Sequence, residues 1–141
     1  MPRERQARLL LAKGYSCEQA IFGAFADLLG CSTVGAVLKA PSRKERGRTC
    51  GAYTAGVLLI RAIYSPADRK QVKKRDEQRQ EQRRQKAATA EAEFSALFTS
   101  LFGTLGCADI RKGREKGRTG MDDVVGATAR LLERVLDKER P

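Results

Sequence analysis

The stretch from Asp68 to Lys86 constrains the fold more than any other part of the chain. Nearly every residue in it is Lys, Arg, Gln, Glu or Asp, and its lone aliphatic side chain is Val72. These residues are good helix formers, and opposite charges recur three or four positions apart, which favours a solvated helix over disorder. Such a helix cannot bury an apolar stripe by itself. The hydrophobic core must therefore come from the rest of the chain.

The segment "SCEQAIFGAFADLLG" carries the strongest helix signal. Ser16 is a candidate N-cap, Gln19 completes a capping box with it, and Gly30 provides the stop. Apolar side chains follow at helical spacing between these ends: Ile21, Phe22, Phe25, Leu28 and Leu29. We expect one helix from Cys17 to Leu29.

Similar boundaries predict further helices in the rest of the chain. The first covers residues 4–13 and is closed by Gly14, the second covers 33–40 and is ended by Pro41, and the third covers 50–64, capped by Thr49 and stopped before Pro66. A fourth begins at Ala87, and its apolar residues share one helical register: Phe94, Leu97, Phe98, Leu101 and Phe102. The last covers 121–138, and its inward-facing residues are Val124, Val125, Leu131, Leu132 and Val135. Aromatic residues are few and Trp is absent, which suits helices packed on helices. We expect an all-α, single-domain bundle of about five helices over residues 1–141.

The course of the charged segment is left open by the sequence. One straight helix from Pro66 to Leu105 would be ~60 Å long and would far overshoot its neighbours. The charged part, about residues 66–88, therefore either projects as a helical arm or folds back through a break.

Charge and cysteine content bear on the cellular setting. The formal net charge of +11 implies attraction to anionic partners. No signal peptide is recognisable, and the longest apolar run, Val57 to Ile60, stops at Arg61, so we expect no transmembrane segment. The four cysteines are not needed as disulfide cross-links, because the apolar content is sufficient to build a hydrophobic core. We expect a cytoplasmic protein with reduced thiols.

The cysteines fall at the expected helix ends. Cys17 lies in the first turn of its helix and Cys31 just past its end, ~21 Å away if that helix is intact. If the chain after Cys31 returns to the starting end, the helix opening at Cys50 runs parallel to the one opening at Cys17. A following antiparallel helix would bring Cys107 to the same end. Cys17, Cys50 and Cys107 would then converge, and Cys31 would lie apart.

The start of a helix is a chemically distinct place for a thiol. Free backbone N–H groups and the positive end of the helix dipole favour the thiolate at Cys17 and Cys50. After Cys50, two pairs of small residues lie one turn apart, Gly51 with Ala55 and Ala52 with Gly56. We expect these flat ridges to let another backbone approach closely.

Three segments carry a resemblance to a known family. "GYSCEQAIFGAFADLLG", "TCGAYTAGVLL" and "LFTSLFGTLGCADI" resemble the redox-active C-GCAxxG-C-C proteins, most specifically at Cys50, Gly51, Ala52 and Gly56. The resemblance implies a thiol-based redox or metal-linked role, with a suggested connection to transport or metal handling. The chain departs from the family pattern at its last cysteine, which is expected near Met121, where none is present.

These observations lead to a thiol-exchange hypothesis. Cys17 and Cys50 form the reactive pair, and Cys107 is a resolving thiol or third ligand, with a partner protein or a small thiol or disulfide as the other reactant. The chain contains no His, which excludes the catalytic mechanisms that need one. A zinc or iron–sulfur site would have to use cysteine or carboxylate ligands. The plainer interpretation is that buried cysteines act as small hydrophobes.

The alternative function is a basic helical module that binds nucleic acid or an acidic partner protein. In that hypothesis the basic residues of 69–86 form a phosphate-binding arm: Arg69, Lys73, Arg79, Arg83 and Arg84. The segment lacks aromatic residues for base stacking and matches no nucleic-acid motif. The plainer interpretation is a solvated helix face.

Overall fold

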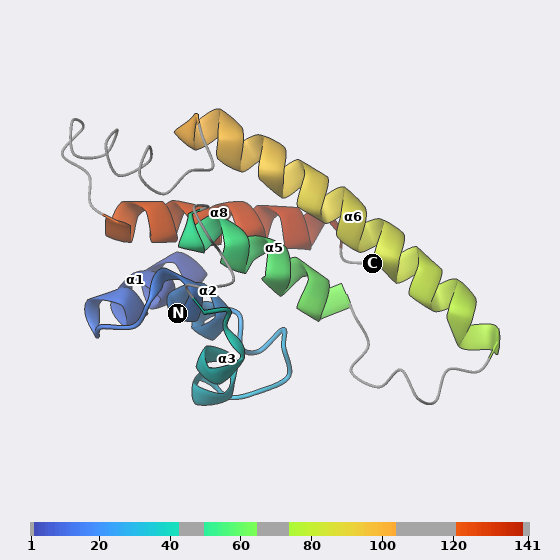
Figure 1. Cartoon of the computed structure of the whole chain (residues 1–141), viewed down its shortest axis with the longest axis horizontal. Coiled ribbons are helices and arrows are strands. Elements are labelled where there is room, and N and C mark those ends of the chain that lie inside the picture. The colour runs from blue at the N-terminus through green and yellow to red at the C-terminus, as the bar shows by residue number, and fades with distance from the viewer. Residues whose placement is uncertain (1, 43–49, 65–73, 104–120, 140–141) are drawn as a thin grey trace.

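The computed structural model describes residues 2–42, 50–64, 74–103 and 121–139 (Figure 1). Six helices account for most of them: α1 (Arg3–Ala12), α2 (Cys17–Ala24), α3 (Thr33–Lys39), α5 (Gly51–Tyr64), α6 (Lys74–Phe102) and α8 (Met121–Glu139). The described residues contain no strand. The prediction of an all-α helical bundle is confirmed.

Helices α1, α2 and α8 form one side of the bundle. Helix α1 runs antiparallel to α8, since Glu4 Oε2 lies 3.3 Å from Arg130 Nε while Arg8 packs on Gly126, one turn earlier in α8. Helix α2 runs antiparallel to α1, because a turn of four residues through Gly14 joins the end of α1 to the start of α2, while Arg3, at the start of α1, binds the carbonyl of Ala24, at the end of α2. Helix α2 therefore points in the same direction as α8.

Helices α5 and α6 form the other side. They are antiparallel, because the Tyr53 ring contacts the tilted ring of Phe98, while Arg61, further along α5, pairs with Glu91, earlier in α6. Figure 1 shows α5 and α8 running in the same direction, with α6 returning across them. The starts of α2, α5 and α8 therefore lie at the end of the bundle where α1 and α6 finish.

The small residues after Cys50 pack as expected in one respect and not in another. Gly51, Ala52, Ala55 and Gly56 are all buried. The neighbour at Gly56 is an aromatic ring rather than a backbone, since a Cβ there would lie 2.4 Å from Phe94 Cζ. The predicted close approach of a second backbone was therefore wrong at this position.

The inward faces of α6 and α8 are largely as predicted. Phe94, Phe98, Val124, Val125, Leu132 and Val135 are buried, whereas Leu97, Phe102 and Leu131 are half-buried. Leu101, which shares the helical register of the apolar residues of α6, is 52% exposed.

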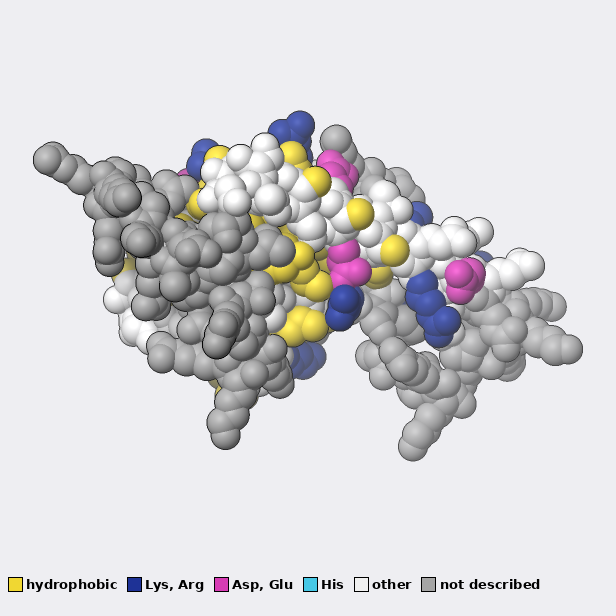
Figure 2. Space-filling model, turned by 45° about the horizontal axis from the view of Figure 1, so that its top comes forward, with side chains coloured by type: hydrophobic (Ala, Val, Ile, Leu, Met, Phe, Trp, Pro, Cys, Tyr) yellow, Lys and Arg dark blue, Asp and Glu magenta, His cyan; other side chains and the backbone are white. Residues whose placement is uncertain are grey.

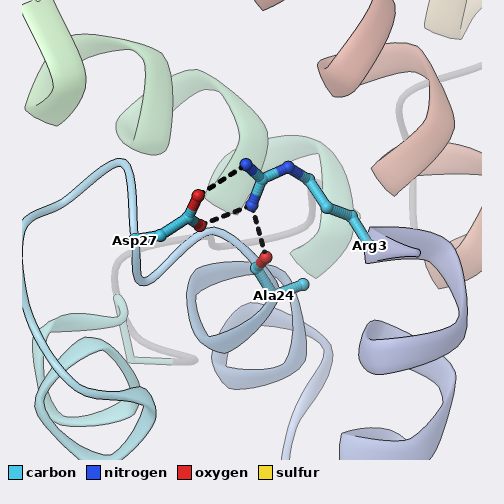
Figure 3. A network of polar contacts seen from close by, with 3 residues as sticks. All are labelled: Arg3, Ala24 and Asp27. Atoms are coloured by element: carbon cyan, nitrogen blue, oxygen red, sulfur yellow. Dashed lines mark hydrogen bonds and ion pairs between the residues drawn. The ribbon is translucent and has the colours of Figure 1, made fainter. Parts of the chain in front are cut away.

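Helix α2 is shorter than the sequence suggests, and Arg3 supplies the reason. Its α-helical pattern ends at Ala24, and hydrogen-bonded turns continue to Gly30. Arg3 Nη1 donates to the Ala24 carbonyl at 2.9 Å (Figure 3), and this carbonyl would otherwise accept from the amide of Leu28 in an unbroken helix. The Leu28 amide instead bonds the Phe25 carbonyl at 3.0 Å. The prediction of one helix to Leu29 was therefore wrong, and the condition for the ~21 Å spacing between Cys17 and Cys31, an intact helix, is not met.

The other helix boundaries follow local chemistry. Ser16 and Gln19 form the predicted capping box, with Ser16 Oγ accepting from the Gln19 amide at 3.1 Å and Gln19 Oε1 accepting from the Ser16 amide at 3.0 Å. Ala40 leaves the helical region for an extended conformation before Pro41. The proposed cap at Thr49 lies outside the described residues.

The described part of the charged segment is one continuous helix. Helix α6 runs unbroken for 29 residues, and its N-terminal part extends past the ends of α5 and α8 (Figure 1). Of the two courses that the sequence left open, the described residues take the projecting one. In the parts of the chain that the structure describes, no helix is long and apolar enough to cross a bilayer.

Candidate functional site

Cys17 is the first residue of α2. It follows the cap Ser16 directly and packs, half-buried, against the edge of the core. The capping box holds the backbone of this first turn in place, so the position of the thiol is fixed by two hydrogen bonds of its neighbours. Cys17 therefore combines partial exposure with the positive end of a helix dipole.

Cys50 stands immediately before α5 and is buried. Its carbonyl accepts the hydrogen bond of the Thr54 amide at 3.0 Å, which makes it the residue from which the helix starts. Its exposure is 0%, and it belongs to the main core cluster. A reagent in solution therefore meets Cys17 before it meets Cys50.

The helix directions bring the starts of α2 and α5 to one end of the bundle. Helix α6 finishes at the same end, at Phe102 and Gly103. Cys107, the third cysteine of the hypothesis, lies outside the described residues, four positions after Gly103. Cys31 lies between α2 and α3, half-buried, with its Sγ 3.8 Å from where a Cβ on Gly35 would stand.

Glu18 is a residue that the sequence analysis missed. It follows Cys17 in the first turn of α2 and is only 1% exposed. Its position was readable from the sequence, because Ile21, Phe22 and Phe25 follow it at i+3, i+4 and i+7, on the buried face of one helix. The helix N-terminus favours a carboxylate at this place. The site therefore contains a buried acid beside its more exposed thiol.

Tyr53 is the second missed residue. It lies one turn after Cys50, stacks on Phe94 with ring centroids 5.6 Å apart, and shares a 2.6 Å hydrogen bond with the Ser95 hydroxyl. Phe98 contacts both of these rings, and Phe102 lies 4.5 Å from Phe98 between centroids. These four rings form an aromatic cluster from the first turns of α5 to the end of α6.

The described donors do not make up a metal site. No three His, Cys, Asp or Glu side chains among the described residues are grouped closely enough to hold a metal ion. The suggested ligand set of Cys17, Cys50 and Cys107 includes a residue outside the described ranges.

Comparison with known proteins gives one match. No curated protein and no solved structure matches this chain. A family model described as "Putative redox-active protein (C_GCAxxG_C_C)" matches residues 15–135, a range that begins just before Cys17 and includes Cys50 and Cys107. The chain therefore belongs to the C_GCAxxG_C_C family.

Proposed function

We propose that the protein exchanges thiols and disulfides through Cys17 and Cys50, with Cys107 as the resolving thiol when Cys50 is not. The observation that carries the proposal is that α2 and α5 start at the same end of the bundle, each with a cysteine at its start. Family membership supports a redox role in general. The burial of Cys50 keeps one of the two proposed thiols away from bulk water.

The proposed reaction has two steps. The Cys17 thiolate attacks one sulfur of a substrate disulfide, forming a mixed disulfide and releasing the other sulfur as a thiolate. The second protein thiolate then attacks the Cys17 sulfur, forms an intramolecular disulfide and releases the remaining substrate sulfur as a thiolate. Two electrons pass from two protein thiols to the substrate disulfide. Each released thiolate takes up a proton, and each attacking thiol has given one up.

The roles of the two thiols follow from their burial. Cys17 is half-buried and can meet a substrate, whereas Cys50 has no exposed surface and can only react within the protein. The reaction requires thiols that are reduced at rest, and the proposal therefore places the protein in the cytoplasm, where such thiols are kept reduced. The reductant class is a dithiol protein or a small thiol.

Disulfide mapping tests the proposal. The reduced protein is treated with a small excess of glutathione disulfide, quenched with an alkylating agent and digested, and the linked peptides are identified by mass spectrometry. We expect a glutathione adduct on Cys17 at early times, followed by a disulfide that joins Cys17 to Cys50 or Cys107. Cys50→Ser and Cys107→Ser, made singly, should show which thiol resolves the adduct, because only the variant without the resolving thiol accumulates it.

Cys31→Ser is the matched control, because Cys31 is half-buried like Cys17 but lies outside the proposed pair. It should leave the reaction unchanged. Faster labelling of Cys31 than of Cys17 at pH 7, or no linked peptide containing Cys17, would overturn the proposal.

A metal-handling role is distinguished by one added measurement. Protein purified without oxygen is assayed for zinc and iron together with its accessible thiols. About one metal per chain, with Cys17 protected from alkylation until a chelator is added, would assign the cysteines as ligands and would contradict the exchange reaction.

A further inference from the structure

The projecting part of α6 has one basic face. Arg79, Arg83 and Lys86 follow each other at i, i+4 and i+7, so their side chains leave the same side of the helix within ~10.5 Å of its length. All three are exposed, and no described residue forms an ion pair with them. Glu81 lies on the opposite side of the helix, where it pairs with Arg84 at 3.9 Å. The positive charge on this face is therefore not neutralised within the described structure.

The composition of the arm decides which class of partner fits it. Residues 78–86 are all Gln, Arg, Glu or Lys, and all but the half-buried Gln80 are exposed. Figure 2 shows that the yellow apolar surface stops short of this end of α6. A membrane surface would need an apolar face to insert, and a protein interface normally has an apolar centre. Phosphate contacts need only Arg, Lys and Gln donors.

The shape of the arm fits the same partner. A helix that leaves the bundle and is solvated on its sides is about 10–12 Å across, and the major groove of duplex DNA is about 12 Å wide. We propose that the Arg79, Arg83 and Lys86 face of α6 binds the phosphate backbone of duplex DNA without sequence preference. The net charge of +11 would speed the encounter without fixing the site. This function is independent of the thiols.

Fluorescence anisotropy with a labelled 20-base-pair duplex of arbitrary sequence, over a series of salt concentrations, tests the proposal. The variant Arg79→Gln, Arg83→Gln and Lys86→Gln keeps good helix formers and removes three charges. We expect its affinity to fall more than tenfold at low salt. The slope of log K against log salt should shrink by about 0.9 for each phosphate that the variant no longer neutralises, roughly 2.7 for three.

A second triple variant separates the site from the overall charge. Lys13→Gln, Lys39→Gln and Arg134→Gln also removes three exposed charges, but from α8 and from residues next to α1 and in α3. It should retain most of the affinity and most of the salt slope. Equal loss in the two triples, no binding by the parent protein, or a preference for an acidic polypeptide over the duplex would each overturn the proposal. Circular dichroism of each variant verifies that the helices are intact.

Discussion

At the scale of single residues, Gly56 of α5 makes room for the ring of Phe94 of α6. An added methyl group there would lie 2.4 Å from Phe94 Cζ and 2.5 Å from Cε2, so the ring, which is buried among its neighbours, must move. Gly56→Ala gains about 0.5–1 kcal/mol of helix propensity but overpacks the core by about 1–3 kcal/mol. We expect a net loss of about 1–2 kcal/mol in the free energy of unfolding, measured by urea denaturation.

Phe94→Leu provides the control for that prediction. Alone it destabilises the protein by leaving a cavity. Combined with Gly56→Ala it should cost at least about 0.5 kcal/mol less than the sum of the two single changes, because the new methyl group then has room. Simple additivity in the cycle would show that the ring is not what excludes a side chain at Gly56.

At the scale of elements, helix α2 ends where a side chain from another helix binds one of its backbone carbonyls. Arg3 does this for α2: it binds the Ala24 carbonyl, both carboxylate oxygens of Asp27, at 2.6 and 2.8 Å, and lies over the Phe25 ring, 4.7 Å from its centroid. The hydrogen bond from Arg3 lowers the pKa of Asp27, and the same bond raises the pKa of Arg3. The N-terminal residue of α1 thus fixes the C-terminal end of α2.

This contact predicts a pH dependence. Because the pKa of Asp27 is lower in the folded state than in the unfolded chain, its contribution is complete above the unfolded value of about 3.9 and is lost as the pH falls through the folded one. The Asp27 side chain is 65% exposed, so Asp27→Asn should cost less than about 1 kcal/mol at pH 7. Urea unfolding should show that the difference from the parent protein shrinks as the pH falls below the unfolded value of about 3.9 and is lost as the folded Asp27 becomes protonated.

Arg3→Gln should behave differently. It removes the bond to the Ala24 carbonyl as well, and a carbonyl does not titrate, so part of its larger loss should persist at low pH. If both variants lost the same stability at every pH, Arg3 would act only as the partner of Asp27.

The elements differ in how far sequence could predict them. Caps at Ser16 and Gly14, and the stop before Pro41, depend on residues within one turn, and all three were readable. The end of α2 depends on Arg3, more than twenty positions away, and apolar spacing continues past it to Leu29, so the pattern alone predicts too long a helix. The ring at Gly56 is likewise a contact between distant segments.

The site shows the same division between local and distant causes. That Cys17 and Cys50 stand at helix starts follows from the sequence around each. How deeply each thiol is buried depends on what other helices cover, and periodicity could not predict that Cys50 has no exposed surface. Glu18 was overlooked because its charge suggested solvent, although its spacing to Ile21 and Phe22 placed it on the core face.

For the whole molecule, α2 and α5 start at the same end of the bundle, and we therefore expect oxidation of Cys17 and Cys50 to change the free energy of unfolding. A disulfide between Cys17 and Cys50 would close a loop of about 34 residues and restrict the unfolded chain, which is typically worth about 3–4 kcal/mol. We therefore expect the oxidised protein to unfold at higher urea concentration than the reduced protein, and the gain to disappear on adding a dithiol reductant. Cys31→Ser should keep the full gain, since it leaves both thiols in place. Cys17→Ser should abolish it, and Cys50→Ser should abolish it unless Cys107 takes the partner's role. If the oxidised protein carries this disulfide but unfolds more easily than the reduced protein, the two helix starts must leave their folded positions for the bond to form. That result would contradict the proposed pairing of Cys17 with Cys50.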